Sequence, residues 1–154
     1  MATRGGTTVS TRSDLSNVEE AITNLSYGID SPPTILVVDD DDDIRSLMAQ
    51  LLRSQGYSVT EAGSASQAET SVLENPPQLI LMDLSMPDTD GLSSIWNIRK
   101  QPGMATVPII IVSAYDAFDL RAEATAAGCC GYLTKPLDPD QLKTMIRSVL
   151  ESTY

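Results

Sequence analysis

The stretch of sequence that decides the fold is Leu79-Ile80-Leu81-Met82-Asp83, four apolar residues followed by an aspartate. Such a run has no alternation of apolar and polar residues, which is typical of a strand buried on both faces of a parallel sheet. Two other runs, at residues 34–38 and 108–112, have the same character. We therefore expect these three segments to be strands of one parallel sheet.

The segments between these runs show the spacing of amphipathic helices. Residues 42–55, for example, carry apolar side chains three or four positions apart and end before Gly56. Further helices are predicted at 65–74, 92–99, 118–127 and 138–150, and further strands at 58–62 and 132–134. Five strand–helix units in succession predict an α/β fold: a doubly wound, five-stranded parallel sheet with helices on both faces.

Polar residues follow the predicted strands. Asp39 and Asp40 follow the first strand, Asp83 the third, Ser113 the fourth and Lys135 the fifth. Ligands of doubly wound sheets bind beyond the carboxyl ends of the strands. Carboxylates that converge there repel one another, and a divalent cation with oxygen ligands relieves the repulsion. We therefore expect a Mg²⁺ site formed by these aspartates.

A cation beside an accessible carboxylate suits phosphoryl transfer, whose transition state requires positioning and neutralisation of charge. Asp83 would be the nucleophile. The metal and Lys135 would neutralise the phosphoryl oxygens, and the Ser113 hydroxyl would donate a hydrogen bond to one of them. The sequence contains no histidine, which excludes histidine-based catalysis and histidine zinc sites.

Four motifs of the chain resemble those of the receiver domain of bacterial two-component response regulators. They are residues 35–41 (ILVVDDD), 82–91 (MDLSMPDTDG), 111–114 (IVSA) and 131–137 (GYLTKPL). Ser113 lies 30 residues after Asp83, and Lys135 lies 22 residues after Ser113, as in that family. The resemblance covers residues from about 33 to 152. It implies the flavodoxin-like (βα)5 receiver fold of a single-domain, chemotaxis-regulator-like type.

The resemblance also assigns roles to the acidic residues. It implies that Asp83 is the phosphoacceptor for a histidine kinase or phosphotransfer protein. Asp40 would be a direct Mg²⁺ ligand, Asp39 a ligand through water, and the backbone carbonyl of Ser85 a further ligand. The protein would then be no enzyme, beyond Mg²⁺-dependent phosphorylation and dephosphorylation of itself.

Other positions resemble those that switch the family between states. Ser113 would be the switch hydroxyl, and Tyr132 the aromatic side chain that moves between outward and inward rotamers. Lys135 is the counterpart of the family's lysine, and precedes a proline whose peptide bond is usually cis. Ser85 and Tyr115 stand where the family tunes the lifetime of the phosphoryl group. The signal would leave through contact with a downstream protein target.

Charge and composition exclude other classes of function. The formal net charge is −11 with only 10 Lys and Arg residues, which disfavours binding to nucleic acid or to an anionic membrane. No apolar run approaches the ~20 residues of a membrane span, and the N-terminus lacks the apolar segment of a signal peptide. Cys129 and Cys130 are adjacent and cannot link distant elements. A reducing cytoplasm is therefore the predicted compartment.

Residues 1–32 form a predicted N-terminal extension, with a disordered tail and a short amphipathic helix. Leu15, Val18, Ile22 and Leu25 lie at helical spacing. We expect this helix to dock on the receiver domain at 33–152 or to mediate dimerisation, although a disordered leader with a chance pattern remains an alternative. At the start of the receiver, Asp42 and Asp43 are expected to cap the first helix or to complement its positive end.

Two other functions remain open from the sequence alone. A degenerate receiver would bind partners without phosphotransfer, but such proteins usually lack the acceptor, an acidic metal ligand or the lysine. A phosphatase or dehalogenase on a similar sheet would also use an aspartyl nucleophile. Those enzymes typically carry a second aspartate two residues after the nucleophile, where this chain has Ser85.

Overall fold

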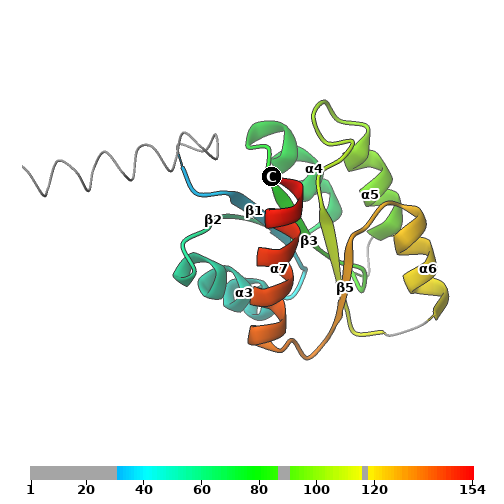
Figure 1. Cartoon of the computed structure of the whole chain (residues 1–154). Helices are drawn as coiled ribbons and strands as arrows, with labels where there is room; N and C mark the ends of the chain where they lie inside the picture. The colour runs from blue at the N-terminus through cyan, green and yellow to red at the C-terminus, as the bar shows by residue number, and fades with distance from the viewer. Residues whose placement is uncertain (1–30, 87–90, 116–117) are drawn as a thin grey trace, which may run out of the picture. The chain divides into compact units, whose positions relative to one another are not determined.

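The sheet consists of five parallel strands in the order β2-β1-β3-β4-β5 (Figure 1). The strands are β1 (Thr34–Val38), β2 (Ser58–Ala62), β3 (Leu79–Asp83), β4 (Ile109–Ser113) and β5 (Gly131–Thr134). Every residue of β3 and β4 is buried, as expected of apolar runs at the centre of a covered sheet. The predicted doubly wound, five-stranded parallel sheet is confirmed.

This computed structural model describes residues 31–86, 91–115 and 118–154. Residues Pro33–Tyr154 form one compact unit. The amphipathic helix expected within residues 15–25 lies outside the described residues. None of the helices in the described ranges has the length and apolar character needed to cross a membrane.

A helix follows each strand. Among the described residues, these five helices are α3 (Asp42–Ser54), α4 (Ala65–Glu74), α5 (Gly91–Arg99), α6 (Phe118–Ala126) and α7 (Pro139–Thr153). Asp41 caps α3, because its side chain accepts hydrogen bonds from the backbone N–H groups of Asp43 and Ile44. The cap is therefore Asp41 rather than Asp42 or Asp43, which lie in the first turn and face the positive end of the helix dipole.

Apolar side chains form one cluster on each face of the sheet. Along β1, Ile35 and Val37 belong to the cluster that includes side chains of α3 and α7. Leu36 and Val38 belong to the cluster that includes side chains of α4, α5 and α6. The sheet is thus covered on both faces, and the carboxyl ends of its strands are left as the place where polar side chains can gather.

Candidate functional site

The sheet topology brings the predicted site residues to one edge. Strands β1, β3, β4 and β5 are successive neighbours, with Val38 paired to Met82 and Ser113 paired to Thr134. Asp39 and Lys135 directly follow two of these strands, and Asp83 and Ser113 end the other two. Asp39, Asp83 and Ser113 are at most 1% exposed, which is unusual for polar side chains in an apolar core.

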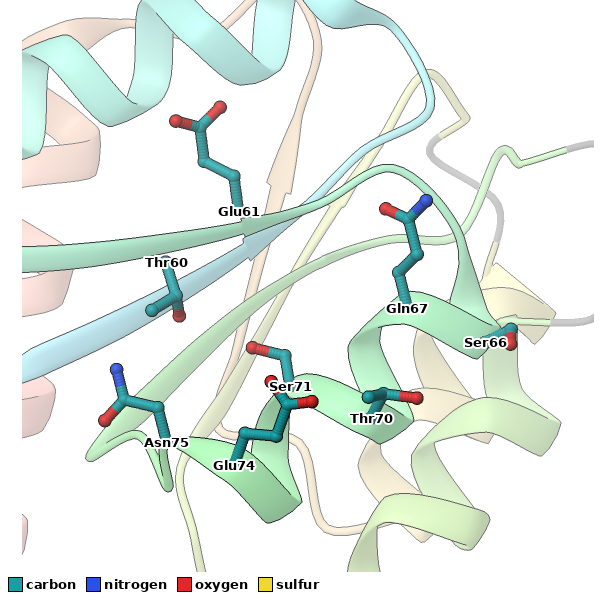
Figure 2. Close-up of a pocket in the computed structure, with 8 residues that line it drawn as sticks. All are labelled: Thr60, Glu61, Ser66, Gln67, Thr70, Ser71, Glu74 and Asn75. Carbon is teal, nitrogen blue, oxygen red and sulfur yellow. The ribbon is translucent and has the colours of Figure 1, made fainter.

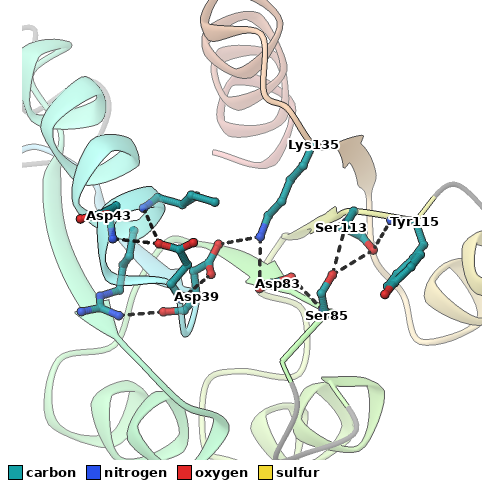
Figure 3. Close-up of polar contacts among 11 residues, drawn as sticks. Asp39, Asp43, Asp83, Ser85, Ser113, Tyr115 and Lys135 are labelled. Atoms are coloured by element: carbon teal, nitrogen blue, oxygen red, sulfur yellow. Dashed lines mark hydrogen bonds and ion pairs between the residues drawn. The ribbon is translucent and has the colours of Figure 1, made fainter.

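Lys135 links the two buried carboxylates. Its Nζ lies 3.0 Å from Asp39 Oδ2 and 3.3 Å from Asp83 Oδ2 (Figure 3). The backbone N–H of Lys135 also donates to the Ser113 carbonyl at 2.8 Å, so the ladder between β4 and β5 fixes the origin of the side chain. The peptide bond to Pro136 is cis, as the resemblance implies.

The charges of these groups affect one another. Burial lowers the pKa of the Lys135 ammonium, but the hydrogen bonds and negative charges of Asp39 and Asp83 outweigh that effect, so its pKa is raised overall. Burial raises the pKa of the Asp39 carboxyl, and the negative charge of Asp83 adds to the rise. The Asp41 N–H and the Lys135 ammonium oppose that rise only in part. Lys135 therefore stays protonated, and the raised pKa of Asp39 reflects its burial beside a second carboxyl group.

Asp39, Asp40 and Asp83 form an acidic cluster. Each offers a carboxylate oxygen, and these oxygens all lie within 4.8 Å of one another. Asp40 is exposed whereas the other two are buried, so the cluster opens to solvent on one side. Three carboxylates against one ammonium leave two negative charges uncompensated. An all-oxygen donor set with an excess of negative charge fits a hard divalent cation such as Mg²⁺.

Arg45 is a positioning residue that the sequence analysis missed. Its Nη1 donates to the Asp39 backbone carbonyl at 2.8 Å, and its Nη2 pairs with Asp42 Oδ1 at 2.7 Å. The guanidinium thereby holds the turn that follows β1. The spacing of Asp42 and Arg45, three residues apart at the start of a helix, is the sequence signal that would have predicted part of this contact.

The other half of the site consists of hydroxyl and amide groups. Ser85 donates its backbone N–H to Asp83 Oδ1 at 2.8 Å, and its Oγ lies 3.5 Å from Ser113 Oγ. Ser85 Oγ also accepts the Ala114 N–H at 3.3 Å, and Ser113 Oγ accepts the Tyr115 N–H at 3.1 Å (Figure 3). The contact between the two serine side chains was not predicted, because it depends on rotamers that spacing along the chain does not specify.

Tyr132 is joined to this half through Tyr115. Its hydroxyl donates to the Tyr115 carbonyl at 2.7 Å, and the Arg121 guanidinium lies 4.4 Å from the centre of its ring. Tyr132 is partly buried and contacts the cluster beneath α4, α5 and α6. A hydrogen bond therefore connects the predicted switch aromatic to the segment that follows Ser113.

A separate groove lies between β2 and α4 and contains none of the predicted site residues (Figure 2). Its volume is about 490 Å³, and its lining is polar, with Thr60 and Glu61 on β2 and six residues of α4 and its end. Because it lacks the carboxylate cluster and the lysine, we assign the chemistry to the edge where Asp83 lies.

The model of the response regulator receiver domain family matches residues 35–147 of the chain. The chain belongs to this family. Receiver domains of response regulators interact with kinases and downstream targets, and they generally bind Mg²⁺. The carboxylate cluster of this receiver fits that cation.

The share of the relatives' own length that this receiver covers differs from one relative to another. It is 38% identical over 113 residues to an uncharacterized 14.6 kDa protein of Leptolyngbya boryana, covering 73% of this chain and 86% of that protein. It is 32% identical over 120 residues to the phosphate regulon transcriptional regulatory protein PhoB of Pseudomonas aeruginosa. That match covers 78% of this chain but 52% of PhoB, so the chain spans about half the length of this transcriptional regulator.

Solved structures have the same fold. The chemotaxis protein CheY4 of Vibrio cholerae matches with a TM-score of 0.75 at 26% identity, covering 77% of this chain and 99% of that one. A putative response regulator of Chloroflexus aurantiacus matches with a TM-score of 0.73 at 30% identity, covering 79% and 99%. The flavodoxin-like receiver fold predicted from the sequence is therefore confirmed.

Proposed function

We propose that this receiver accepts a phosphoryl group on Asp83 from a histidine kinase or phosphotransfer protein, and that phosphorylation changes its binding to a downstream protein target. The observation that carries the proposal is the position of the Lys135 ammonium, 3.3 Å from Asp83 and 3.0 Å from Asp39. A degenerate receiver would lack one of these groups, whereas the acceptor, the acidic cluster and the lysine all occur together here.

In the transfer step, a carboxylate oxygen of Asp83 forms a bond to phosphorus while the bond between phosphorus and the donor's leaving atom breaks. The leaving atom keeps the bonding electron pair and takes up a proton, and Asp83 becomes an acyl phosphate. The Lys135 ammonium, which lies 3.3 Å from Asp83, would pair with the phosphoryl oxygens, and the Ser113 hydroxyl would donate a hydrogen bond to one of them.

The carboxylates of Asp39, Asp40 and Asp83, with the backbone carbonyl of Ser85, would hold Mg²⁺. When bound, the cation would neutralise charge that develops on the transferring phosphoryl group. The protein's own contribution is to keep three carboxylates close together at the edge of a rigid sheet, with Lys135 beside them. The chain would catalyse only its own phosphorylation and dephosphorylation.

Ser113 and Tyr132 would carry the change to the surface. If the Ser113 hydroxyl turns toward a phosphoryl oxygen, its bond with the Tyr115 N–H is perturbed. The Tyr115 carbonyl also accepts a hydrogen bond from the Tyr132 hydroxyl, so the Tyr132 ring is coupled to the same segment.

Both cysteines are free thiols, consistent with the reducing cytoplasm in which we place this signalling step.

The proposal is tested with a small-molecule phosphodonor such as acetyl phosphate, labelled on phosphorus, in the presence and absence of Mg²⁺. The wild-type protein should take up Mg²⁺-dependent, aspartyl-type label, and Asp83→Asn should lose it because the amide is a poor nucleophile. Asp43→Asn is a matched control, since Asp43 belongs to the acidic run of Asp39 and Asp40 but lies outside the cluster that contains Asp83.

The outcomes separate the proposal from its rivals. Undiminished label on Asp83→Asn would show that another residue is the acceptor. No label on the wild-type protein with any donor would favour a degenerate receiver. Sustained hydrolysis of a generic phosphomonoester would favour a phosphatase instead.

A further inference from the structure

Ser85 connects the proposed acceptor to the end of β4. Its backbone N–H contacts Asp83 Oδ1 at 2.8 Å, whereas its side chain turns toward Ser113 and Ala114 (Figure 3). Ser85 Oγ lies 3.5 Å from Ser113 Oγ and 3.3 Å from the Ala114 nitrogen. One neutral oxygen atom therefore accepts the Ala114 N–H and lies against the Ser113 hydroxyl, two groups that can donate hydrogen bonds at the edge of the sheet.

These two donors are groups that a phosphoryl group on Asp83 would need. An aspartyl phosphate carries several anionic oxygens that require positive charge or hydrogen-bond donors. Lys135 supplies the positive charge, and Ser113 lies on the opposite side of Asp83 from Asp39 (Figure 3). The Ser113 hydroxyl and the N–H of the next residue, Ala114, can both donate hydrogen bonds there. Both of these donors are in contact with Ser85 Oγ.

We propose that the Ser85 hydroxyl takes the place of a phosphoryl oxygen in the unphosphorylated protein and competes with the phosphoryl group for Ser113 and Ala114. This inference rests on the proposed function, because it assigns Ser85 a role in the phosphorylation of Asp83. The Ser85 side chain then acts as an internal brake, distinct from the part of its backbone carbonyl in holding the metal.

The arrangement of Ser113 supports the competition. Ser113 Oγ already accepts the Tyr115 N–H at 3.1 Å, and it lies 3.5 Å from Ser85 Oγ in a contact in which either hydroxyl can donate. An anionic oxygen forms stronger hydrogen bonds than a neutral hydroxyl, so a phosphoryl group displaces the serine. The displacement nevertheless breaks the hydrogen bonds that Ser85 makes. This costs more than displacing a water molecule, because a hydroxyl held within the same chain competes for these donors better than free water does.

The test compares Ser85→Ala, which removes the hydroxyl, with Ser85→Thr, which retains it. The probe is beryllofluoride in the presence of Mg²⁺, a mimic of the phosphoryl group, with the bound form followed by ¹⁹F NMR. Ser85→Ala should bind the probe about two- to tenfold more tightly than the wild type, the range expected for exchanging one or two net hydrogen bonds. The affinity of Ser85→Thr should stay near that of the wild type. The extent of phosphorylation by acetyl phosphate should follow the same ranking, with Ser85→Ala above the wild type and Ser85→Thr.

Two further measurements distinguish competition from a general structural effect. The affinity for Mg²⁺ without beryllofluoride should be the same in Ser85→Ala and the wild type, because the variant keeps the backbone carbonyl. In a Ser113→Ala background, the gain from Ser85→Ala should shrink, because one of the two contested donors is then absent.

An unchanged or weaker affinity of Ser85→Ala for the probe would overturn this inference, and weaker binding would show that the hydroxyl donates to the anion instead. An undiminished gain in the Ser113→Ala background would also overturn it. If neither the wild type nor any variant responded to beryllofluoride or to acetyl phosphate, the proposed function itself would fail. A response of the wild type that Ser85→Ala leaves unaltered would remove only the role of Ser85.

Discussion

The Lys135 ammonium lies 3.0 Å from the Asp39 carboxylate, although the two residues are 96 positions apart in the chain. Asp39 has no exposed surface, and the same ammonium also lies 3.3 Å from the buried Asp83. One cation thus serves two carboxylates that would otherwise be buried beside each other without compensation. A divalent metal ion at the cluster would serve the same two charges, so Lys135 and the metal have overlapping electrostatic effects.

We therefore expect Lys135→Met to lower the free energy of unfolding by about 2 kcal/mol in the absence of divalent cations, because two buried carboxylates lose a charge-assisted hydrogen bond. Mg²⁺ should bind the variant at least as tightly as the wild type, since a competing positive charge is gone. Urea unfolding with and without Mg²⁺ measures both effects. Lys100→Met, at an exposed lysine, is the control. A variant that loses Mg²⁺ binding would contradict the electrostatic account.

Asp40→Ala should have the opposite effects to Lys135→Met: little change in the stability of the metal-free protein, and weaker binding of Mg²⁺. Asp40 is the exposed member of the cluster, so its removal should change the stability of the metal-free protein by no more than about 0.5 kcal/mol. Removal of a direct ligand should weaken Mg²⁺ binding at least tenfold, and the rise in thermal midpoint on adding Mg²⁺ should shrink accordingly. Asp43→Ala removes the same charge outside the cluster and should keep the full rise. An equal rise in thermal midpoint for the wild type, Asp40→Ala and Asp43→Ala would show that Asp40 is not a Mg²⁺ ligand.

The sequence was most informative about the strands. Leu79–Asp83 and Ile109–Ser113 are apolar at every position but the last, and short runs of this kind are typical of strands buried on both faces of a parallel sheet. The grouping of Asp39, Asp83, Ser113 and Lys135 followed from their places at the carboxyl ends of predicted parallel strands, and the strand order in the structure makes those strands neighbours. Periodicity and topology therefore predicted both the fold and the group of residues at the site.

Contacts that depend on side-chain direction could not be predicted. Several aspartates in a row are nearly equivalent as helix caps on paper, and only the turn after β1 makes Asp41 the cap. The contact of Ser85 with Ser113 needs a particular χ1 angle, and the bond from Tyr132 to the Tyr115 carbonyl depends on the path of a loop. Local spacing contains neither kind of information.

Arg99 is a further case, and it leads to a prediction about stability. Its guanidinium donates to the carbonyls of Val107 at 2.7 Å, Gly128 at 3.1 Å and Ala127 at 3.2 Å, and lies 3.3 Å from two more. It thereby joins the end of α5 to the loop before β4 and to the end of α6. We expect Arg99→Ala to lower the free energy of unfolding by about 2–4 kcal/mol, since several carbonyls lose a charged donor at once.

Urea unfolding of Arg99→Ala, Arg99→Lys and Arg147→Ala tests this role. Arg99→Lys should recover only part of the loss, because an ammonium cannot donate in the planar fork of a guanidinium. Arg147 is exposed on α7, and its removal should change stability by no more than about 0.5 kcal/mol. Equal free energies of unfolding for Arg99→Ala and Arg147→Ala would show that the hydrogen bonds of Arg99 do not stabilise the fold.

The last prediction concerns the two free thiols near Arg99, Cys129 and Cys130. Burial raises the pKa of Cys129 to about 11 from an ordinary value of 9.0, although the Arg99 charge opposes the rise. Since the folded-state pKa lies above the unfolded one, the fold favours the protonated thiol. The stabilisation is fully present below about pH 9 and is lost as the pH rises towards about 11. In folded protein at about pH 8, iodoacetamide should therefore modify Cys129 far more slowly than it does in urea.

Mass spectrometry of alkylated peptides measures the rate at each thiol against pH, and Cys130→Ser leaves Cys129 as the reporter. The rate at Cys129 should keep rising with pH up to about 11 before it levels off, because the thiolate fraction grows until the pH passes the pKa. The stability of Cys129→Ser should fall less than that of the wild type between about pH 9 and 11, because the serine hydroxyl does not titrate there. Equally rapid alkylation of Cys129 in folded and unfolded protein at about pH 8 would show that the thiol is not shielded by the ends of α5 and α6.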